Sequence, residues 1–203
     1  MEIAKRLLIG VFGGSGSGKT SICNCISSWS SCTLIVPIDS YYNPVLFSDS
    51  IKTNFDKPNC IDKKLLVNQV TNLKNGKAVH KPVYDFTTHQ RLDIPEKIIP
   101  KRNIIVEGLF SCYWKELRDL YDLIVYIHAP ADVRLARRIR RDVVERDRSV
   151  NSVLNQYLDT VRPGHKNFLL PIIKYADITL DSNKVDIETN ATNLQKYIDN
   201  LEV

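Results

Sequence analysis

Short apolar runs alternate along the chain with longer segments in which apolar residues recur every three or four positions. The short runs have the length of buried β-strands and cover residues 7–12, 33–38, 103–106, 123–128 and 176–180. The longer segments have the period of α-helices and cover residues 19–29, 62–75, 113–120, 131–146, 149–161, 165–175 and 187–201. Strands that alternate with helices indicate a parallel sheet with helices on both faces, and therefore an α/β fold.

One segment departs from this alternation. Residues 77–100 contain two extended stretches, KAVHKPVYDF and RLDIPEKIIP, around a polar turn. This pattern predicts a β-hairpin inserted into the α/β core rather than a second domain. The length of 203 residues favours a single domain over residues 1–203.

The first predicted strand runs directly into a glycine-rich stretch, GGSGSGKT, which we call the phosphate loop. Its members fit the pattern G-x-x-x-x-G-K-[ST] and are Gly13, Gly14, Ser15, Gly16, Ser17, Gly18, Lys19 and Thr20. Glycines let consecutive N–H groups turn toward an anion, and the following helix points its positive end at the same place. The pattern predicts that Lys19 reaches the outer phosphates of a nucleotide and that Thr20 coordinates Mg²⁺.

Two further predicted strands end in carboxylates. Asp39 follows the second strand and Glu107 ends the third. Because ligands of open α/β sheets lie at the carboxyl ends of the strands, we expect both residues to face Lys19 and Thr20. A carboxylate pair beside a phosphate loop indicates a metal ligand and a proton acceptor. The alternative is that each carboxylate only caps local structure.

The composition indicates what kind of protein this is and where in the cell it is expected. A charged fraction of 25% and an apolar fraction of 43% are ordinary for a soluble globular protein. No apolar run approaches the roughly 20 residues of a membrane span, and the start of the chain is read as strand rather than signal peptide. Five cysteines without zinc-like spacing indicate reduced thiols and a cytoplasmic location.

The net charge of +5 is concentrated in residues 131–150, which hold seven arginines and four acidic residues. Helical spacing predicts one arginine face and a neighbouring core face. The arginine face is Arg134, Arg138, Arg141 and Arg148, and the core face is Ala136, Ile139 and Val143. A single arginine stripe suits one compact polyphosphate better than a nucleic acid. The alternative is a solvated face with pairs such as Arg141 to Glu145.

A phosphate loop alone does not distinguish a kinase from a nucleotide-binding switch or adaptor. Asn183-Lys184-Val185-Asp186 matches the N-K-x-D pattern of guanine-binding switches, but no D-x-x-G occurs in the sequence. We therefore interpret 183–186 as a polar loop before the last helix. A small-molecule kinase needs a Mg–ATP site, an acceptor pocket, a base and arginines, and the sequence offers candidates for all four.

Several stretches together resemble the uridine kinase family, also called uridine–cytidine kinases. The stretches are DSYY at 39–42, NFDKP at 54–58, PVYDFTTHQR at 82–91, the arginine run from 134 to 148, QY at 156–157 and PIIKYAD at 171–177. The resemblance implies a P-loop fold with a helical lid, placed at residues 131–162. It also implies phosphorylation of the 5′-hydroxyl of uridine or cytidine by ATP or GTP with Mg²⁺, in pyrimidine salvage.

The resemblance also assigns roles to residues. Asp39 would be the base, Thr20 and Glu107 would hold Mg²⁺ with Asp39 contributing through water, and Arg138 and Arg141 would close over the transferred phosphate. Arg146 is a weaker candidate for this closure. The nucleoside would be held by Asp56 at the ribose hydroxyls, by base contacts and by apolar walls. The base contacts and walls are Tyr84, His89, Arg148, Gln156, Tyr42, Phe55, Phe86 and Leu109.

Some features depart from the family pattern. The segment between Asp39 and Asp56 is short, Asn43 stands where arginine is frequent, and residues 161–166 lack the usual acidic-aromatic run. These changes bear on substrate breadth rather than on the reaction. Nicotinamide riboside kinase is the alternative within the wider group, and the PVYDF hairpin argues against it. The resemblance further implies a homotetramer that binds neither nucleic acid nor membrane.

Overall fold

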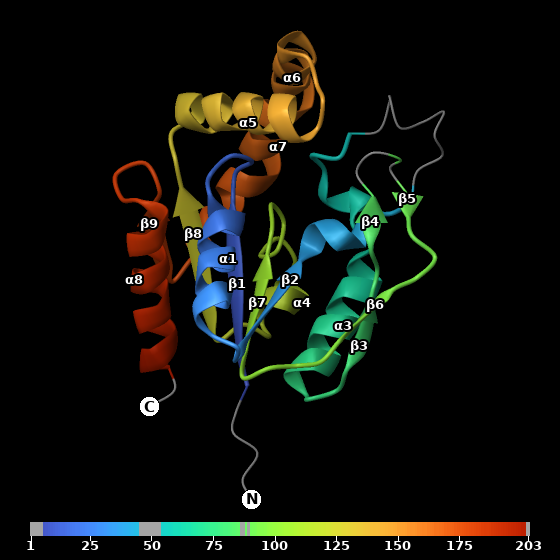
Figure 1. Ribbon diagram of the computed structural model, residues 1–203, viewed down its shortest axis with the longest axis vertical. Helices are drawn as coiled ribbons and strands as arrows, with labels where there is room; N and C mark the ends of the chain where they lie inside the picture. Colours follow the sequence, from blue (N-terminus) through green and yellow to red (C-terminus); the bar gives the residue numbers. More distant parts are fainter. Residues whose placement is uncertain (1–5, 45–53, 86–87, 89, 202–203) are drawn as a thin grey trace, which may run out of the picture.

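The structure is a computed structural model that describes residues 6–44, 54–85, 88 and 90–201. A five-stranded sheet in the order β2-β7-β1-β8-β9 lies at its centre (Figure 1). The strands are β1 Leu7–Gly13, β2 Thr33–Pro37, β7 Asn103–Glu107, β8 Leu123–His128 and β9 Ile178–Asp181. Every neighbouring pair is parallel, which confirms the predicted α/β fold.

Helices cover both faces of this sheet, because side chains of a strand alternate between the faces. Leu7, Ile9 and Val11 pack on one face against two helices, while Leu8 and Phe12 point to the other. The first face is covered by α1 Lys19–Trp29 and α8 Ile187–Asn200. The second is covered by α3 Lys63–Lys74 and α4 Lys115–Arg118.

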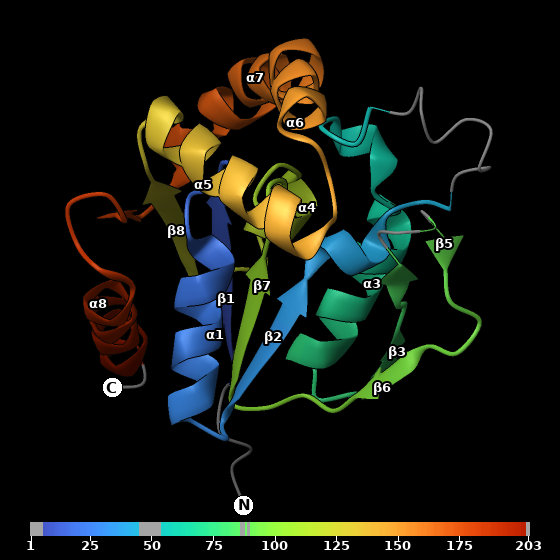
Figure 2. The ribbon, with the colours of Figure 1, turned by 45° about the horizontal axis from the view of Figure 1, so that its top comes forward.

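A second group of helices lies across the carboxyl ends of the strands (Figure 2). It comprises α5 Ala131–Glu145, α6 Val150–Gln156, the π-helix η3 Tyr157–Val161, α7 Arg162–Gly164, the π-helix η4 His165–Leu169 and the 3₁₀-helix η5 Leu170–Tyr175. The predicted helices at 149–161 and 165–175 are therefore one nearly continuous helical path. Short 3₁₀-helices η1 Ile38–Tyr41 and η2 Pro58–Cys60 lie in the loops at the same end of the sheet.

The predicted hairpin at 77–100 is present as two small antiparallel pairs. β3 Val79–Lys81 pairs with β6 Glu96–Ile98, and β4 Tyr84–Asp85 pairs with β5 Gln90–Arg91. Arg91 attaches the tip of this hairpin to η1, because its guanidinium donates to the carbonyls of Tyr41 and Tyr42 at 3.0 and 2.9 Å. The hairpin therefore borders the loop that follows β2.

The prediction for the faces of α5 was wrong. Ala136 and Val143 are exposed, whereas Arg134, Arg138 and Asp142 are buried. The reason is that α5 does not pack on the apolar face of the sheet. It crosses the end of the sheet and meets the phosphate loop, whose surface is polar. Arg148 also does not share the helical face, because α5 ends at Glu145.

Candidate active site

The phosphate loop connects β1 to α1 and has the backbone of an anion site. Gly16 has φ 80°, and a side chain there would meet the backbone carbonyl of Arg134, so only glycine fits. Gly18 caps α1 with φ 87°, no side chain caps the helix, and its first turn holds no acidic residue. The free N–H groups of that turn are therefore available to phosphate oxygens.

A buried hydroxyl inside the loop supports the same conclusion. Ser17 Oγ is buried and makes no hydrogen bond within the described part of the chain. A buried hydroxyl without a hydrogen-bond partner destabilises the folded state, and an anionic oxygen bound in the loop would accept a hydrogen bond from it. The phosphate loop therefore fits a nucleotide phosphate chain.

The predicted metal ligands lie together. Thr20 Oγ1 is 3.2 Å from both carboxylate oxygens of Glu107, which ends the strand next to β1. Burial raises the pKa of Glu107; Asp39 raises it further, while Lys19 and the hydrogen bond from Thr20 lower it. A divalent cation would supply the positive charge that this buried carboxylate lacks.

The donor set also suits one particular cation. A hydroxyl and a carboxylate are hard oxygen ligands, and Mg²⁺ in nucleotide sites takes only one or two of them from the protein. Among the residues that the structure describes, no group of three or more His, Cys, Asp or Glu could hold a metal. The residues therefore fit a Mg²⁺ ion that shares its coordination with substrate phosphates.

Asp39 is close enough to both Glu107 and Asp56 to affect the pKa of each. It is half-buried in η1, directly after β2, whose Pro37 is in register with Glu107. Asp39 raises the pKa of Glu107 on one side and the pKa of Asp56 on the other. The predicted base therefore has the predicted metal ligand Glu107 and the predicted ribose ligand Asp56 as electrostatic neighbours.

Three aromatic residues form one wall beyond Asp39. The rings of Tyr42 and Phe55 meet edge to face at 5.5 Å, and Tyr42 lies 5.4 Å from Tyr84. Leu109, in the loop after β7, is half-buried against the neighbouring core. Of these four predicted nucleoside contacts, Tyr42 and Phe55 lie in the connection between β2 and α3, Tyr84 lies in β4 and Leu109 lies after β7. Phe86 and His89 lie outside the described residues.

Asp56 is buried and held by a residue that sequence reasoning missed. Thr160 in η3 donates its hydroxyl to Asp56 Oδ2 at 2.7 Å. Burial raises the pKa of Asp56, while the Thr160 hydrogen bond and Arg138 lower it. The carboxylate therefore has one oxygen occupied by the protein and keeps acceptor capacity for a ligand.

Arg138 and Arg148 both donate to the side-chain amide of Gln156. Arg138 donates to Gln156 Oε1 at 2.7 Å, and Arg148 Nη1 donates to the same oxygen. Arg138 also donates to Ser15 Oγ at 2.9 Å, so α5 touches the phosphate loop. Since both guanidinium groups occupy Gln156 Oε1, the side-chain nitrogen of Gln156 is left to act as a donor.

The two remaining predicted arginines, Arg141 and Arg146, contact a buried acid that lies between them and the first two. Arg141 Nη2 lies 2.8 Å and Arg146 Nη1 3.5 Å from Asp142 Oδ1, and Asp142 is fully buried. Sequence analysis did not single out Asp142. The available signal was its position four residues after Arg138 in a helix, where opposite charges meet.

Residues around the loop also support its shape. Ser182 donates to the carbonyl of Ser17 at 2.6 Å, and Arg137 Nη2 donates to the carbonyl of Ser182 at 2.8 Å. The adjoining segment 183–186 is a polar turn before α8, as predicted. Asp186 caps that helix by accepting the N–H of Thr189 at 2.8 Å.

These features define a P-loop α/β protein in which the phosphate loop, the Thr20–Glu107 pair and the buried carboxylate of Asp56 lie at the carboxyl ends of the strands. The phosphoribulokinase/uridine kinase family model matches residues 8–188. This match covers most of the chain, which therefore belongs to that family.

Comparisons with individual proteins agree. The chain is 43% identical over 199 residues to a uridine kinase of Staphylococcus aureus strain JH9, covering 94% of this chain and 96% of the relative. The fold is similar to that of a possible uridine kinase from Bacillus stearothermophilus, with TM-score 0.65, 20% identity and coverage of 89% and 91%. It is also similar to phosphoribulokinase from Rhodobacter spheroides, with TM-score 0.64, 13% identity and coverage of 88% and 71%.

Over the described ranges, no helix is long and apolar enough to cross a membrane. All five cysteines are free thiols.

Proposed function

We propose that this chain transfers the terminal phosphoryl group of ATP to the 5′-hydroxyl of uridine or cytidine, giving ADP and UMP or CMP for pyrimidine salvage. Membership of the family and the 43% identity to a uridine kinase support the reaction class and the substrate. The site residues support the proposal independently, because they supply the parts that phosphoryl transfer requires.

The observation that carries the proposal is the arrangement of three carboxylates. Glu107 accepts a hydrogen bond from the Thr20 hydroxyl of the phosphate loop, and Asp56 accepts one from Thr160 in η3. Asp39 raises the pKa of both Glu107 and Asp56. Glu107, at the phosphate loop, would serve the phosphate donor, and Asp56 would bind the sugar of the second substrate. Asp39, the electrostatic neighbour of both, would accept the proton where the phosphoryl group is transferred.

In the proposed mechanism, the chain mainly positions groups. Asp39 accepts the proton of the 5′-hydroxyl as that oxygen bonds to the terminal phosphorus and the bond to ADP breaks. Lys19 and the N–H groups at the start of α1 hold the phosphate oxygens, and Arg141 and Arg146 neutralise charge on the transferred group. Mg²⁺, held by Thr20 and Glu107, would neutralise further phosphate charge when bound.

The acceptor is proposed to lie among Asp56 and the aromatic wall. Asp56 would accept both ribose hydroxyls, while Tyr42, Phe55 and Tyr84 provide flat apolar contacts. Phe86 and His89 are proposed to contact the base, where a neutral imidazole would donate to uracil or accept from cytosine. On the donor side, a hollow of about 500 Å³ lined by Arg137, Ser182, Asp186, Ile187 and Glu188 would take the purine.

The test is a panel of acceptors with ATP and MgCl₂, measured by ADP release. Uridine, cytidine, thymidine, adenosine and nicotinamide riboside are offered separately to the wild type and to Lys19→Ala. We expect ADP release with uridine and cytidine only, and none with the folded variant. Turnover of nicotinamide riboside alone would assign the alternative kinase, and nucleotide binding without acceptor-dependent ADP release would indicate a switch or adaptor.

Three further properties are proposed. ATP or GTP would serve as donor, which a donor titration tests. The free thiols are consistent with a cytoplasmic location. A homotetramer, implied by the resemblance, is tested by light scattering of the purified protein.

A further inference from the structure

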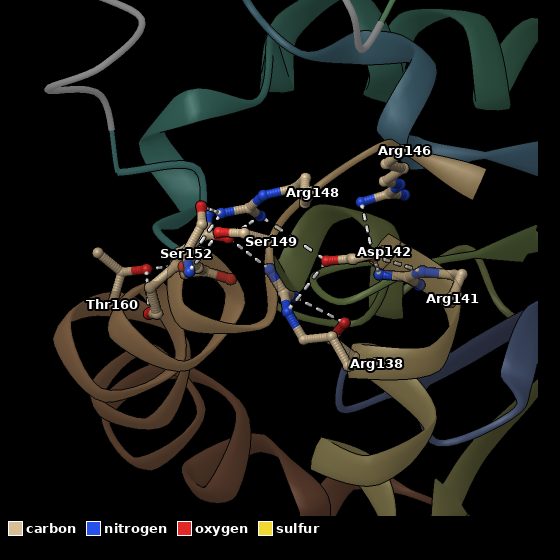
Figure 3. Close-up of polar contacts among 11 residues, drawn as sticks. Arg138, Arg141, Asp142, Arg146, Arg148, Ser149, Ser152 and Thr160 are labelled. Carbon is tan, nitrogen blue, oxygen red and sulfur yellow. Dashed lines mark hydrogen bonds and ion pairs between the residues drawn. The ribbon is translucent and has the colours of Figure 1, made fainter. Parts of the chain in front are cut away.

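One buried carboxylate lies at the centre of four arginines. Asp142 is fully buried, and its oxygens lie within ion-pair distance of Arg138, Arg141, Arg146 and Arg148 (Figure 3). We call this group the arginine cluster. Its members come from α5 and from the loop that leads to α6.

The two carboxylate oxygens serve different arginines. Oδ1 is 2.8 Å from Arg141 Nη2 and 3.5 Å from Arg146 Nη1. Oδ2 is 3.5 Å from Arg138 Nε and 3.7 Å from Arg148 Nη1. Under the proposed function, Arg141 and Arg146 face the transferred phosphate, while Arg138 and Arg148 both contact Gln156, a predicted nucleoside contact, and Arg138 also contacts the phosphate loop.

Arg138 and Arg148 have hydrogen-bond partners beyond Asp142. Arg138 and Arg148 share Gln156 Oε1, and Arg138 is anchored to Ser15 of the phosphate loop. Arg141 donates to Asp142 through two of its nitrogens, Nε at 2.9 Å and Nη2 at 2.8 Å. Asp142 is thus the shared anion through which the positions of Arg141 and Arg148 are linked.

A phosphate group would change the charge around the cluster. Within the cluster, Asp142 is one acid beside four arginines, and like charges at this distance repel each other. Burial and neighbouring arginines lower the pKa of Arg138 and of Arg146, while Asp142 raises both, Asp56 raises that of Arg138, and Asp39 and Glu145 raise that of Arg146. A phosphate on the side of Oδ1 would add a second anion for Arg141 and Arg146 to pair with.

We propose that Asp142 is a positioning residue that couples the two substrates. When phosphate draws Arg141 and Arg146 toward it, the carboxylate turns more fully to Arg138 and Arg148 and sets them for the nucleoside. Binding of nucleotide then strengthens binding of uridine, and by thermodynamic reciprocity uridine strengthens binding of nucleotide. This inference rests on the proposed function, because it takes the assignment of the arginines from it.

The first experiment measures uridine affinity by calorimetry with and without a non-hydrolysable ATP analogue and MgCl₂. We expect the analogue to tighten uridine binding about fivefold or more in the wild type, a usual size for coupling between sites. In Asp142→Asn this ratio should fall toward one, and Asp142→Glu should recover part of it. Asp132→Asn, an exposed acid in the first turn of the same helix, is the control with the same charge change.

The outcomes separate the two proposals. If the wild type phosphorylates uridine, and the analogue tightens uridine binding equally in the wild type and in Asp142→Asn, only the coupling role is overturned. A wild type that binds no uridine overturns the proposed function, and the coupling role with it. Loss of the ratio together with an unchanged unfolding midpoint supports the coupling role, because a merely structural effect would change stability.

A second measurement covers the case in which Asp142→Asn does not fold. Arg141→Lys and Arg148→Lys are compared singly and together, all with Asp142 present. If Asp142 links the two arginines, the combined loss in kcat/KM should differ from the product of the single losses by more than about threefold. Losses that multiply within about twofold would show that the arginines act independently and overturn the inference.

Discussion

Thr160 donates its hydroxyl to Asp56 across 2.7 Å, which joins the helical path over the sheet to the loop before α3. The contact is reinforced nearby, where Gly164 lies so close to Asp56 that an added side chain would meet the backbone carbonyl of Asp56. The proposed ribose ligand is therefore oriented by an element that lies 104 residues away in the sequence.

Removing this hydroxyl should weaken uridine binding. Thr160→Val keeps the shape of the side chain but leaves Asp56 Oδ2 without its donor, so we expect the dissociation constant to rise about tenfold. The hydrogen bond lowers the pKa of Asp56, so Asp56 should become protonated at a higher pH in the variant. As the pH falls, the variant should therefore lose uridine affinity at a higher pH than the wild type. Calorimetry from pH 8 to pH 5 measures both effects. Thr192→Val, at an exposed position of α8, is the control and should change neither.

Asp39 and Asp56 should differ in kinetics. Asp39→Asn keeps hydrogen bonding but removes the proton acceptor, so kcat should fall ~10²-fold or more with uridine affinity nearly unchanged. Asp56→Ala removes the ribose acceptor, so uridine affinity should fall and the preference for uridine over deoxyuridine should narrow. Measured kcat, uridine affinity and the ribose-to-deoxyribose ratio decide the assignment. Turnover retained by Asp39→Asn but lost by Asp56→Ala, with affinity intact, would exchange the two roles.

Glu107→Gln should raise the Mg²⁺ concentration needed for half-maximal activity by about tenfold or more, because an amide is a weaker ligand than a carboxylate for a hard cation. Chelation of Mg²⁺ should stop the wild-type enzyme, and added MgCl₂ should restore it. The nearby exposed acid Glu116 pairs with Lys63 instead, so Glu116→Gln serves as the control. An unchanged Mg²⁺ requirement in Glu107→Gln would remove this residue from the metal site.

His165 should make the fold sensitive to acid. Burial, with Arg134 and His128 as positive neighbours, lowers the pKa of His165 to about 4, against roughly 6.5 in an unfolded chain. Between these values only the unfolded chain binds the proton, so His165 disfavours the fold increasingly as pH falls from about 6.5 to about 4. His165→Gln should flatten this part of the stability curve, measured by urea unfolding. His80→Gln, at an exposed histidine, should leave the slope as it is.

The periodic pattern predicted the sheet, the covering helices and the hairpin, because strand and helix periods are local properties of the sequence. It also placed Thr20 beside Glu107, since parallel strands bring their ends together. The exposed faces of α5 could not be predicted, because the pattern does not reveal that this helix meets a polar loop instead of an apolar sheet. Asp142 and Thr160 were not predicted for a related reason, because only the fold brings them together with their partners.

The order of strands has a consequence for protein synthesis. β1 is the first strand to be made, yet its neighbours in the sheet are β7 and β8, which end at Glu107 and His128. At about 5–20 residues per second, roughly 5 to 25 seconds separate the synthesis of β1 from that of its second partner. Until Glu107 is made the apolar run LLIGVF has no native partner strand, and until His128 is made it has one on one side only, so nascent chains stalled before residue 128 should be the ones that chaperones retain.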